Sequence, residues 1–496
     1  MRKRPPNVFV FMTDQEQAQV VKKGHPCHTL VAEKLAEEGL LFDRCYTPAA
    51  HSCPARACYF TGLYPSHHGI YNNILTHTSI GGAINPGCRM FSENLRQAGW
   101  NLGHTGKWHC SRTERPSERG WEEVSSNALP QSRTTPEAFW ESALKNAAPE
   151  DEGPRRRGEI ITPGYRRRFL YGTTDRQMED FGDYKVVMKA IEAMERYAKE
   201  DKPFFIHCGP TGPHDPYVIP EKYAALHDAK TIGLPPNFHD DLQDKPRIYQ
   251  RHNRHLWSQL SEEEVKESIA HYWGYCAKMD DYRKLVYDAI DSLGLRDNTM
   301  LIFTSDHGDY VGAHGLYCKG VPCFDEAHRV PLIVRWPEGI ENPGRVVDEF
   351  ITLCDFAPTF LEVAGVEQNP TSGASFAPFF KNSEVEGWTQ EFHTQFNGVE
   401  LYYTQRFIQT KNYKYVFNGF DFDEMYDLTK DPYELKNVAD DPDYRDIQLD
   451  LVKRMWKFSC RERDIWGNAY FTVALAPWGP NVALREIAEQ EGAKKD

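Results

Sequence analysis

Short apolar runs alternate along the chain with longer segments in which apolar residues recur at helical spacing. The runs at residues 8–12, 204–206, 300–303 and 332–334 contain no polar residue. Runs of this kind, without alternation of polarity, are typical of strands that are buried on both faces. Buried strands that alternate with amphipathic helices predict the α/β fold class, with a large sheet sandwiched by helices.

Two of the predicted helices have clear signatures. One presents a single apolar face, formed by Tyr184, Val187, Ile191 and Met194. Another begins after Ser261, which stands three residues before Glu264 as in a capping box, and we expect it to end near Gly294.

The same pattern divides the chain into two parts. Residues 110–172 are polar and rich in Arg, Pro and Gly, which predicts a long irregular insertion over one end of the sheet. Residues 370–387 are similar and predict a connection between subdomains. Beyond them, residues 402–408 and 414–416 alternate in polarity and predict a small antiparallel sheet. We therefore expect a catalytic α/β domain at residues 1–385 and a C-terminal α+β subdomain at residues 386–496.

Composition narrows the functional classes. The 496-residue chain has a formal net charge of −14, so we expect no nucleic-acid partner. It contains no run of about 18 apolar residues, so we expect no membrane span. The twelve cysteines include no CxxC pair, which indicates reduced, mostly buried thiols. With no signal peptide recognisable after Met1, these features predict a cytoplasmic protein.

Acidic residues and a histidine follow two of the predicted strands. Asp14 comes directly after the first run, and Asp306 and His307 follow the third. Because α/β folds place their sites at the carboxyl ends of strands, these side chains could hold a divalent cation. Hard oxygen ligands favour Ca²⁺ or Mg²⁺. The alternative is that each aspartate only caps a helix.

A third feature is a hydroxyl residue just before a predicted helix. Ser52 is followed by Pro54 and Arg56. A helix N-terminus favours anions, and the guanidinium adds a fixed positive charge. The alternative is an ordinary turn in which the serine caps the helix.

At this point a family resemblance becomes specific. Ser52-Cys53-Pro54-Ala55-Arg56, with Thr61-Gly62 beyond it, resembles the signature of type I, formylglycine-dependent sulfatases of the alkaline phosphatase superfamily, in its Ser-type form. Three more blocks resemble that family in order and spacing: Gly106-Lys107-Trp108-His109, Pro213-His214-Asp215-Pro216-Tyr217, and Ser305-Asp306-His307-Gly308 with Lys319. The match covers roughly residues 7–440. It implies a mixed, mostly parallel sheet of the alkaline phosphatase type.

The resemblance implies a sulfuric ester hydrolase that releases inorganic sulfate. In this family a maturase oxidises the first residue of the signature, so formylglycine derived from Ser52 would be the nucleophile. Its hydrate has two hydroxyl groups, of which one attacks sulfur and the other later expels sulfate. A plain serine lacks the second hydroxyl and would stall as a sulfated serine. Serine precursors in this family are oxidised in the cytoplasm, which agrees with the predicted localisation.

The resemblance also implies roles for individual residues. A divalent cation, expected to be Ca²⁺, would be held by Asp14, Gln15, Ser52, Asp306 and His307. The sulfuryl oxygens would be bound and neutralised by Arg56, Lys107, His214 and Lys319. His214 would protonate the leaving alkoxide, and His109 would be the base that collapses the intermediate.

The polar insertion favours a sulfated carbohydrate as the substrate. Its arginine clusters at residues 155–157 and 166–168 could contact a second anionic group of such a substrate. The alternative is a solvated charged loop.

Two departures from the family pattern leave alternatives open. Many members have two successive aspartates where this chain has Asp14-Gln15, a form that is similar to phosphonate monoester hydrolases of the same superfamily. A phosphonate monoester or phosphodiester hydrolase on the same scaffold is therefore one alternative. The other departure is Ser52, natural or a replacement of cysteine: if it is never oxidised, the chain is a non-catalytic anion or glycan binder. Cys53 is out of register with Arg56 and Thr61, so we do not assign it as the nucleophile.

Overall fold

A nine-stranded mixed sheet forms the centre of the protein. The structure, a computed structural model, describes residues 4–126, 135–148, 153–399, 401–465 and 467–493. The strand order is β11-β2-β12-β10-β1-β8-β3-β4, with β13 paired to β2. Five of the eight pairings among these strands are parallel, so the predicted mixed, mostly parallel sheet is confirmed. The strands are β1 (Asn7–Thr13), β2 (Leu40–Tyr46), β3 (Asn101–Gly106), β4 (Glu122–Ser126), β8 (Phe204–Gly209), β10 (Thr299–Ser305), β11 (Arg329–Val330), β12 (Leu332–Arg335) and β13 (Arg345–Thr352).

The four predicted apolar runs form β1, β8, β10 and β12, because each of these strands is buried on both faces. In β1, Val8, Val10 and Met12 pack on one side of the sheet, whereas Phe9 and Phe11 pack on the other. All five side chains are at most 1% exposed, which leaves no position for a polar residue.

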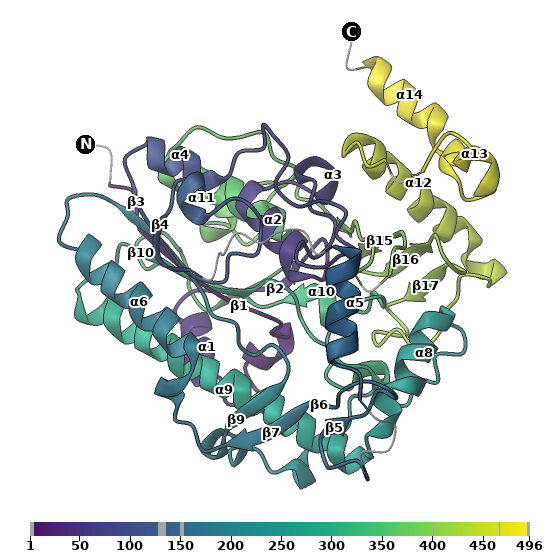
Figure 1. Cartoon of the computed structure of the whole chain (residues 1–496). Coiled ribbons are helices and arrows are strands. Elements are labelled where there is room, and N and C mark those ends of the chain that lie inside the picture. Colours follow the sequence, from purple (N-terminus) through teal and green to yellow (C-terminus); the bar gives the residue numbers. More distant parts are fainter. Residues whose placement is uncertain (1–3, 127–134, 149–152, 400, 466, 494–496) are drawn as a thin grey trace.

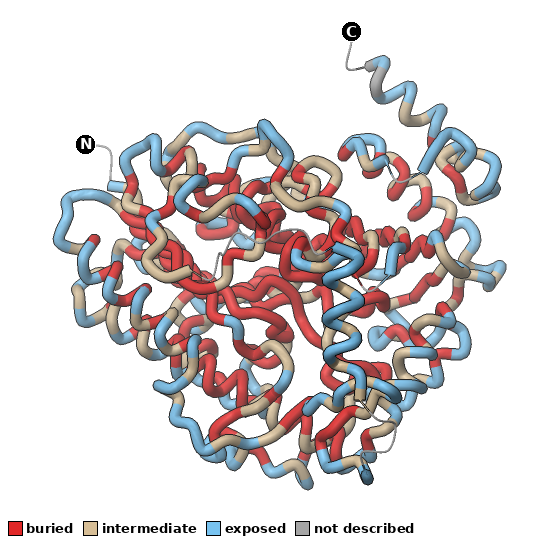
Figure 2. Tube along the Cα trace, viewed as in Figure 1, coloured by how far each residue is buried: buried red, intermediate tan, exposed pale blue. Residues whose placement is uncertain are grey.

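Helices cover both faces of the sheet, and the buried core lies between these layers (Figures 1 and 2). The first face packs against α2 (Ser52–Thr61), α4 (Phe91–Gln97) and α11 (Phe356–Ala364). The second face packs against α1 (Leu30–Glu37), α6 (Gly182–Tyr197) and α9 (Glu262–Ser292). This arrangement confirms the predicted sandwich.

Both helices with sequence signatures are present. The first is α6, which buries Val187, Ile191 and Met194. The second is α9, whose capping box is complete: Ser261 Oγ accepts from the backbone nitrogen of Glu264 at 3.3 Å, and Glu264 Oε2 accepts from the backbone nitrogen of Ser261 at 3.1 Å.

The segment at residues 110–172 is more regular than its composition predicts. Its strand β4 extends the central sheet, parallel to β3. The sequence Glu-Glu-Val-Ser-Ser of β4 gave no apolar signal because an edge strand with one open side can be polar. The segment also contains α5 (Pro136–Lys145), whose first turn is capped by Thr135 Oγ1, and the short strands β5 (Glu159–Ile160), β6 (Arg168–Phe169) and the start of β7 (Tyr171–Thr174).

The predicted antiparallel sheet is present in the C-terminal part. Its strands, in the order β14-β15-β16-β17, are β14 (Glu391–His393), β15 (Gln405–Thr410), β16 (Tyr413–Asn418) and β17 (Glu424–Asp427). One face packs on α12 (Arg445–Arg461). The other joins Phe350 and Tyr46 of the central sheet, so the two sheets share apolar contacts. The remaining elements are α3 (Pro65–His68), α7 (Glu221–Ala224), β9 (Tyr217–Pro220), α8 (Arg247–His255), α10 (Asp325–His328), α13 (Phe471–Ala474) and α14 (Leu484–Ala493).

All twelve cysteines are free thiols, and nine of them are buried, as the sequence predicts. Among the helices that the structure describes, none combines the length and the apolar character needed to cross a membrane.

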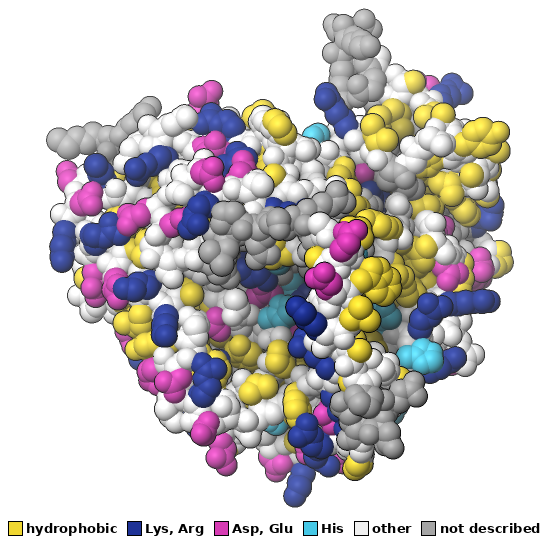
Figure 3. Space-filling view, in the orientation of Figure 1, with side chains coloured by type: hydrophobic (Ala, Val, Ile, Leu, Met, Phe, Trp, Pro, Cys, Tyr) yellow, Lys and Arg dark blue, Asp and Glu magenta, His cyan; other side chains and the backbone are white. Residues whose placement is uncertain are grey.

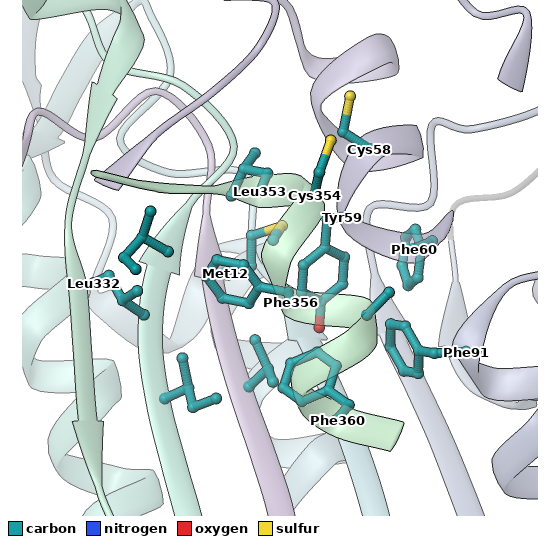
Figure 4. Packing of buried hydrophobic residues seen from close by; sticks show 14 of the residues in the cluster. Met12, Cys58, Tyr59, Phe60, Phe91, Leu332, Leu353, Cys354, Phe356 and Phe360 are labelled. Carbon is teal, nitrogen blue, oxygen red and sulfur yellow. The ribbon is translucent and has the colours of Figure 1, made fainter. Parts of the chain in front are cut away.

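Among the polar atoms without a partner in the core between β1 and the first helical layer is the hydroxyl of Tyr59. Tyr59 on α2 packs edge-on against Phe91, Phe356 and Phe360 (Figure 4). Its hydroxyl is buried, and no described residue accepts or donates a hydrogen bond there. The ring therefore stabilises this layer, whereas the hydroxyl adds a desolvation cost.

Replacing Tyr59 separates these two contributions. We expect Tyr59→Phe to raise the free energy of unfolding by about 1 kcal/mol, because an unsatisfied hydroxyl is removed. Tyr59→Ala leaves a cavity and should lower it by about 3–5 kcal/mol. Denaturant unfolding of the three proteins measures both changes. A clear destabilisation by Tyr59→Phe would show that the hydroxyl has a partner, such as an ordered water.

Candidate functional site

The site lies at the carboxyl end of the two central strands. Parallel pairing of β1 with β10 continues to Thr13 and Ser305, so Asp14 and Asp306 leave the sheet side by side. The backbone nitrogen of Asp306 donates to the Thr13 carbonyl at 3.3 Å, and that of Gln15 donates to Asp306 Oδ1 at 3.2 Å. The strand register therefore brings together residues almost 300 positions apart in the sequence.

Asp14, Asp306 and His307 form a buried cluster that suits a divalent cation. His307 Nε2 is 3.6 Å from Asp14 Oδ1 and 3.6 Å from Asp306 Oδ1. Ligands that share a Ca²⁺ ion at 2.3–2.6 Å stand about 3.5 Å apart when they subtend a right angle. Asp14 Oδ1 is buried with no hydrogen-bond partner among the described residues. This is the only such cluster of acidic, histidine or cysteine side chains in the part of the chain that the structure describes.

The orientation of the His307 ring also fits a metal ligand. Its Nδ1 lies 3.0 Å from the Gly308 carbonyl, so the proton of the neutral ring belongs on Nδ1. Burial lowers the pKa of His307 well below its usual range, and the charge of Lys319 lowers it further. The lone pair of Nε2 is thereby left available on the side of the two carboxylates.

Ser52 is the first residue of α2 and lies beside this cluster. Its Oγ is 3.1 Å from His307 Nε2 and 3.4 Å from Asp14 Oδ2. Lys107, which follows β3, donates to the same Oγ at 3.0 Å. The hydroxyl thus stands at a helix N-terminus, next to both the cation cluster and an ammonium.

Arg56 lies one turn further along α2 and holds the two carboxylates. It is fully buried, and its Nε donates to Asp306 Oδ2 at 2.9 Å. Its Nη2 donates to Asp14 Oδ2 at 3.4 Å, and its Nη1 to the Lys107 carbonyl at 3.1 Å. In this position the positive charge of Arg56 balances the negative charge of the Asp14 and Asp306 carboxylates, which stabilises the site.

The two aspartates have opposite pKa shifts. Burial alone would raise the pKa of Asp14, but nearby basic side chains, Lys107 foremost and Arg56 among them, hold it well below its usual range. Burial, followed by the charge of Asp14, raises the pKa of Asp306. Asp14 is therefore the more firmly ionised of the pair.

Lys107 and His109 enter the site from the loop after β3. Besides Ser52, the Lys107 ammonium contacts Asp14 Oδ2, and its side chain is 14% exposed. His109 has a left-handed backbone, with φ of 56°, and a buried Nδ1 without a partner among the described residues. Burial, together with the charges of Lys107 and Arg56, holds the pKa of His109 well below its usual range. Its ring is therefore neutral and able to accept a proton.

His214 and Lys319 form the more open side of the site. Lys319 Nζ lies 2.6 Å from His214 Nε2, and His214 Nδ1 lies 2.8 Å from the Asp215 carbonyl. The His214 side chain is 35% exposed, in contrast to the fully buried Asp14 and Asp306. In the space-filling view, histidine and basic side chains meet at the surface beside α5 (Figure 3). A ligand can therefore approach from this side.

The side chain of Gln15 is held by Lys319 and by two aspartates that the sequence analysis did not assign. Its Nε2 donates to Asp309 Oδ2 at 2.5 Å and to Asp215 Oδ1 at 3.1 Å, and its Oε1 accepts from Lys319. Burial raises the pKa of Asp309 to about 7. Asp309 directly follows the Ser305–Gly308 block, and only this position, two residues after His307, could have drawn attention to it.

The arginine clusters of the insertion are mostly paired within the protein. Four of the six make ion pairs with three glutamates: Arg155 with Glu264, Arg157 with Glu267, and Arg156 and Arg167 with Glu159. These four guanidinium groups anchor the insertion to α9 and to β5. A structural role therefore accounts for most of this positive charge.

Sequence comparison identifies the family to which this fold and site belong. The Sulfatase family model matches residues 6–366, and a second model, described as N-sulphoglucosamine sulphohydrolase, C-terminal, matches residues 312–461. The first match covers more than half of the chain, so the chain belongs to the sulfatase family.

Individual relatives extend along nearly the whole chain. The uncharacterized sulfatase YidJ of Escherichia coli is 28% identical over 95% of this chain and 90% of the relative. The N-acetylglucosamine-6-O-sulfatase of Bacteroides thetaiotaomicron is 25% identical over 90% of this chain and 85% of the relative.

Solved structures share the fold. A protein in complex with its substrate D-glucosamine-2-N,6-O-disulfate has a TM-score of 0.72 at 22% identity, covering 93% of this chain and 99% of that chain. The phosphonate monoester hydrolase of Agrobacterium radiobacter has a TM-score of 0.74 at 23% identity, covering 92% and 96%. At this level of identity the likeness establishes the architecture alone.

Proposed function

We propose that this sulfatase removes a sulfate group from a carbohydrate, with a formylglycine derived from Ser52 as nucleophile and Ca²⁺ as metal. The observation that carries the proposal is the position of Ser52. Its Oγ lies 3.1 Å from His307 Nε2 and 3.0 Å from Lys107 Nζ, beside the Asp14 and Asp306 carboxylates. An ordinary capping serine needs none of these neighbours.

The surrounding residues supply what sulfate transfer needs. When bound, the metal would polarise a sulfate oxygen and favour the deprotonated nucleophile, and the hydrated formylglycine would provide a second hydroxyl group. Asp14, Asp306 and His307 would hold the cation, with the residue at position 52 as a further oxygen donor, whereas Gln15 Oε1 accepts from the Lys319 ammonium. Arg56 holds the two carboxylates in place and opposes the rise in the pKa of Asp306, while Lys107 offers positive charge to the sulfuryl oxygens.

Two histidines would transfer protons in the proposed reaction. His214 Nε2 lies against the Lys319 ammonium, so the pair carries a proton on the open side of the site, where the alkoxide leaves. His109 is buried and neutral, which suits the base that removes a proton from the remaining hydroxyl. The two roles thus belong to histidines in different environments.

A sulfated carbohydrate is supported by the polar groups on the open side and by two of the similar proteins. The described residues of the open side include the polar side chains of His214 and Lys319, which suit a hydroxylated anion. The Bacteroides relative is a carbohydrate sulfatase, and the neighbouring structure holds a glucosamine disulfate.

A second candidate function rests on Gln15. The Asp14-Gln15 pair is similar to that of phosphonate monoester hydrolases, one of which shares the fold. A relative in Trinickia caryophylli, 26% identical over 92% of this chain, is described as a multifunctional alkaline phosphatase superfamily protein. Phosphonate monoesters and phosphodiesters are therefore the competing substrates to test.

The maturation of Ser52 implies a partner and a compartment. Oxidation of the serine requires a dedicated maturase, which we propose acts on this chain in the cytoplasm. The twelve free thiols support a reducing compartment.

A substrate panel tests the proposed reaction. We expect the matured enzyme to release sulfate from at least one sulfated mono- or disaccharide with a kcat/KM about tenfold or more above that for 4-nitrophenyl sulfate, a phosphonate monoester or a phosphodiester. Released sulfate and phosphate are measured by ion chromatography. A phosphonate or diester as best substrate would establish the second candidate instead.

Oxidation of Ser52 decides activity. Peptide mass spectrometry should show that residue 52 loses two hydrogen atoms only when the protein is made with a serine-type maturase, and multiple turnover should follow that modification. In Cys53→Ser, residue 52 should still be oxidised and the enzyme should be as active as the wild type, because Cys53 is out of register with Arg56 and Thr61. Ser52→Ala should be inactive under both conditions. Full multiple turnover by protein with wholly unmodified Ser52 would refute the assignment.

Metal binding can be measured without turnover. Ca²⁺ at about 100 times its Kd should stabilise the EDTA-treated protein by about 2.7 kcal/mol, because only the folded chain assembles the ligands. Asp306→Asn should abolish this response in thermal unfolding. Asp280→Asn is the matched control: Asp280 is equally an aspartate buried in the core, but it caps α1 and should leave the Ca²⁺ response intact. A wild type that gains no stability from any divalent cation would contradict the metal site.

A further inference from the structure

Asp309 links three segments of the site, although the mechanism above gives it no role. Its side chain is fully buried. Its Oδ1 accepts hydrogen bonds from the backbone nitrogens of Val311 at 3.0 Å and Cys318 at 2.8 Å. Its Oδ2 accepts from the Tyr217 hydroxyl and from Gln15 Nε2, both at 2.5 Å. One carboxylate therefore ties the end of β1 to the loops that carry His214 and Lys319.

The contacts of Gln15 allow only one orientation of its amide. Nε2 donates to Asp309 and to Asp215, whereas Oε1 accepts from the Lys319 ammonium. A flipped amide would direct Oε1 at two carboxylates and Nε2 at an ammonium, so all three contacts would become repulsive. The two aspartates thus determine that the carbonyl oxygen faces Lys319.

We propose that Asp309 is a positioning residue for Lys319. It acts by two routes: through the Gln15 amide, and through the backbone nitrogen of Cys318, the residue directly before Lys319. Together they hold the Lys319 ammonium 2.6 Å from His214 Nε2. The inference rests on the proposed function, in which Lys319 binds the sulfate group and shares a proton with His214.

The same network explains why glutamine follows Asp14. A second aspartate at position 15 would bring a third carboxylate to Asp309 and Asp215, with no donor between them. Glutamine supplies the donor for these two groups and still presents an oxygen to Lys319. The presence of glutamine instead of aspartate at position 15 is therefore linked to the presence of Asp309.

An exchange of donor and acceptor tests this role. Asp309→Asn keeps Oδ1 for the two backbone nitrogens but places an NH2 group against Gln15 Nε2. We expect kcat/KM of the matured enzyme to fall about 10–100-fold, because the ammonium is displaced from the reacting group. In Gln15→Glu/Asp309→Asn the new carboxylate accepts from the new amide and from Lys319 but no longer offers a donor to Asp215, so part of the loss, about threefold or more in kcat/KM, should return. If Asp309 had only a structural role, a substitution at position 15 would not restore kcat/KM.

Tyr217→Phe is the matched control, since it removes the other hydrogen bond to Asp309 Oδ2 without touching Gln15. It should keep kcat/KM within about threefold of the wild type, whatever its effect on thermal stability.

The same series of variants is measured by calorimetry for the binding of inorganic sulfate to unmatured protein. Asp309→Asn should weaken sulfate binding by about tenfold in Kd, and the double variant should restore it.

Three results would overturn the inference: Asp309→Asn with wild-type values in both assays, a double variant no better than Asp309→Asn, or an equal loss in Tyr217→Phe. A wild type that binds sulfate but never turns over a sulfate ester would instead overturn the proposed function. In that case the calorimetric series still decides the role of Asp309.

Discussion

Two carboxylates buried side by side are the constraint on which the rest of the site depends. The register of β1 and β10 places Asp14 and Asp306 at one sheet edge, and both are fully buried. Buried like charges are strongly unfavourable unless opposite charge is supplied within the protein. Arg56 supplies it from α2, and Lys107 from the loop after β3. Because Arg56 lies one turn beyond Ser52, its contact with both aspartates also fixes the start of the helix, and hence the candidate nucleophile.

This compensation is incomplete in a way that favours a cation. Arg56 and Lys107 contact the Oδ2 atoms of the two aspartates, whereas Asp14 Oδ1 has no partner among the described residues. His307 faces that open side with a neutral ring. The protein thus neutralises one oxygen of each carboxylate itself and leaves Asp14 Oδ1 available to the proposed cation, so two positive side chains and a candidate cation site can share the same carboxylates.

The sequence predicted those parts of the structure that depend on local pattern. Strands buried on both faces, such as β1, are recognisable because every residue must be apolar, and Asp14 and Asp306 follow from where these strands end. The polar edge strand β4 gave no such signal. Nor did the pairing of the insertion arginines, since Arg155 meets Glu264 only through the fold. Asp309 was missed for the same reason: its importance lies in contacts with Gln15 and Tyr217, which are distant in sequence.

The buried and the exposed sides of the site are therefore under different constraints. The floor, with Asp14, Asp306 and Arg56, is set by strand register and charge balance, so a change at one of these residues disturbs the charge balance of the others. The open side, with His214 and Lys319, depends on loops held through Asp309 and Gln15. Loops can change while the floor persists. Enzymes described as acting on sulfated sugars and on phosphonate esters can thus share this architecture, and the choice between such substrates must be made by the groups on the open side.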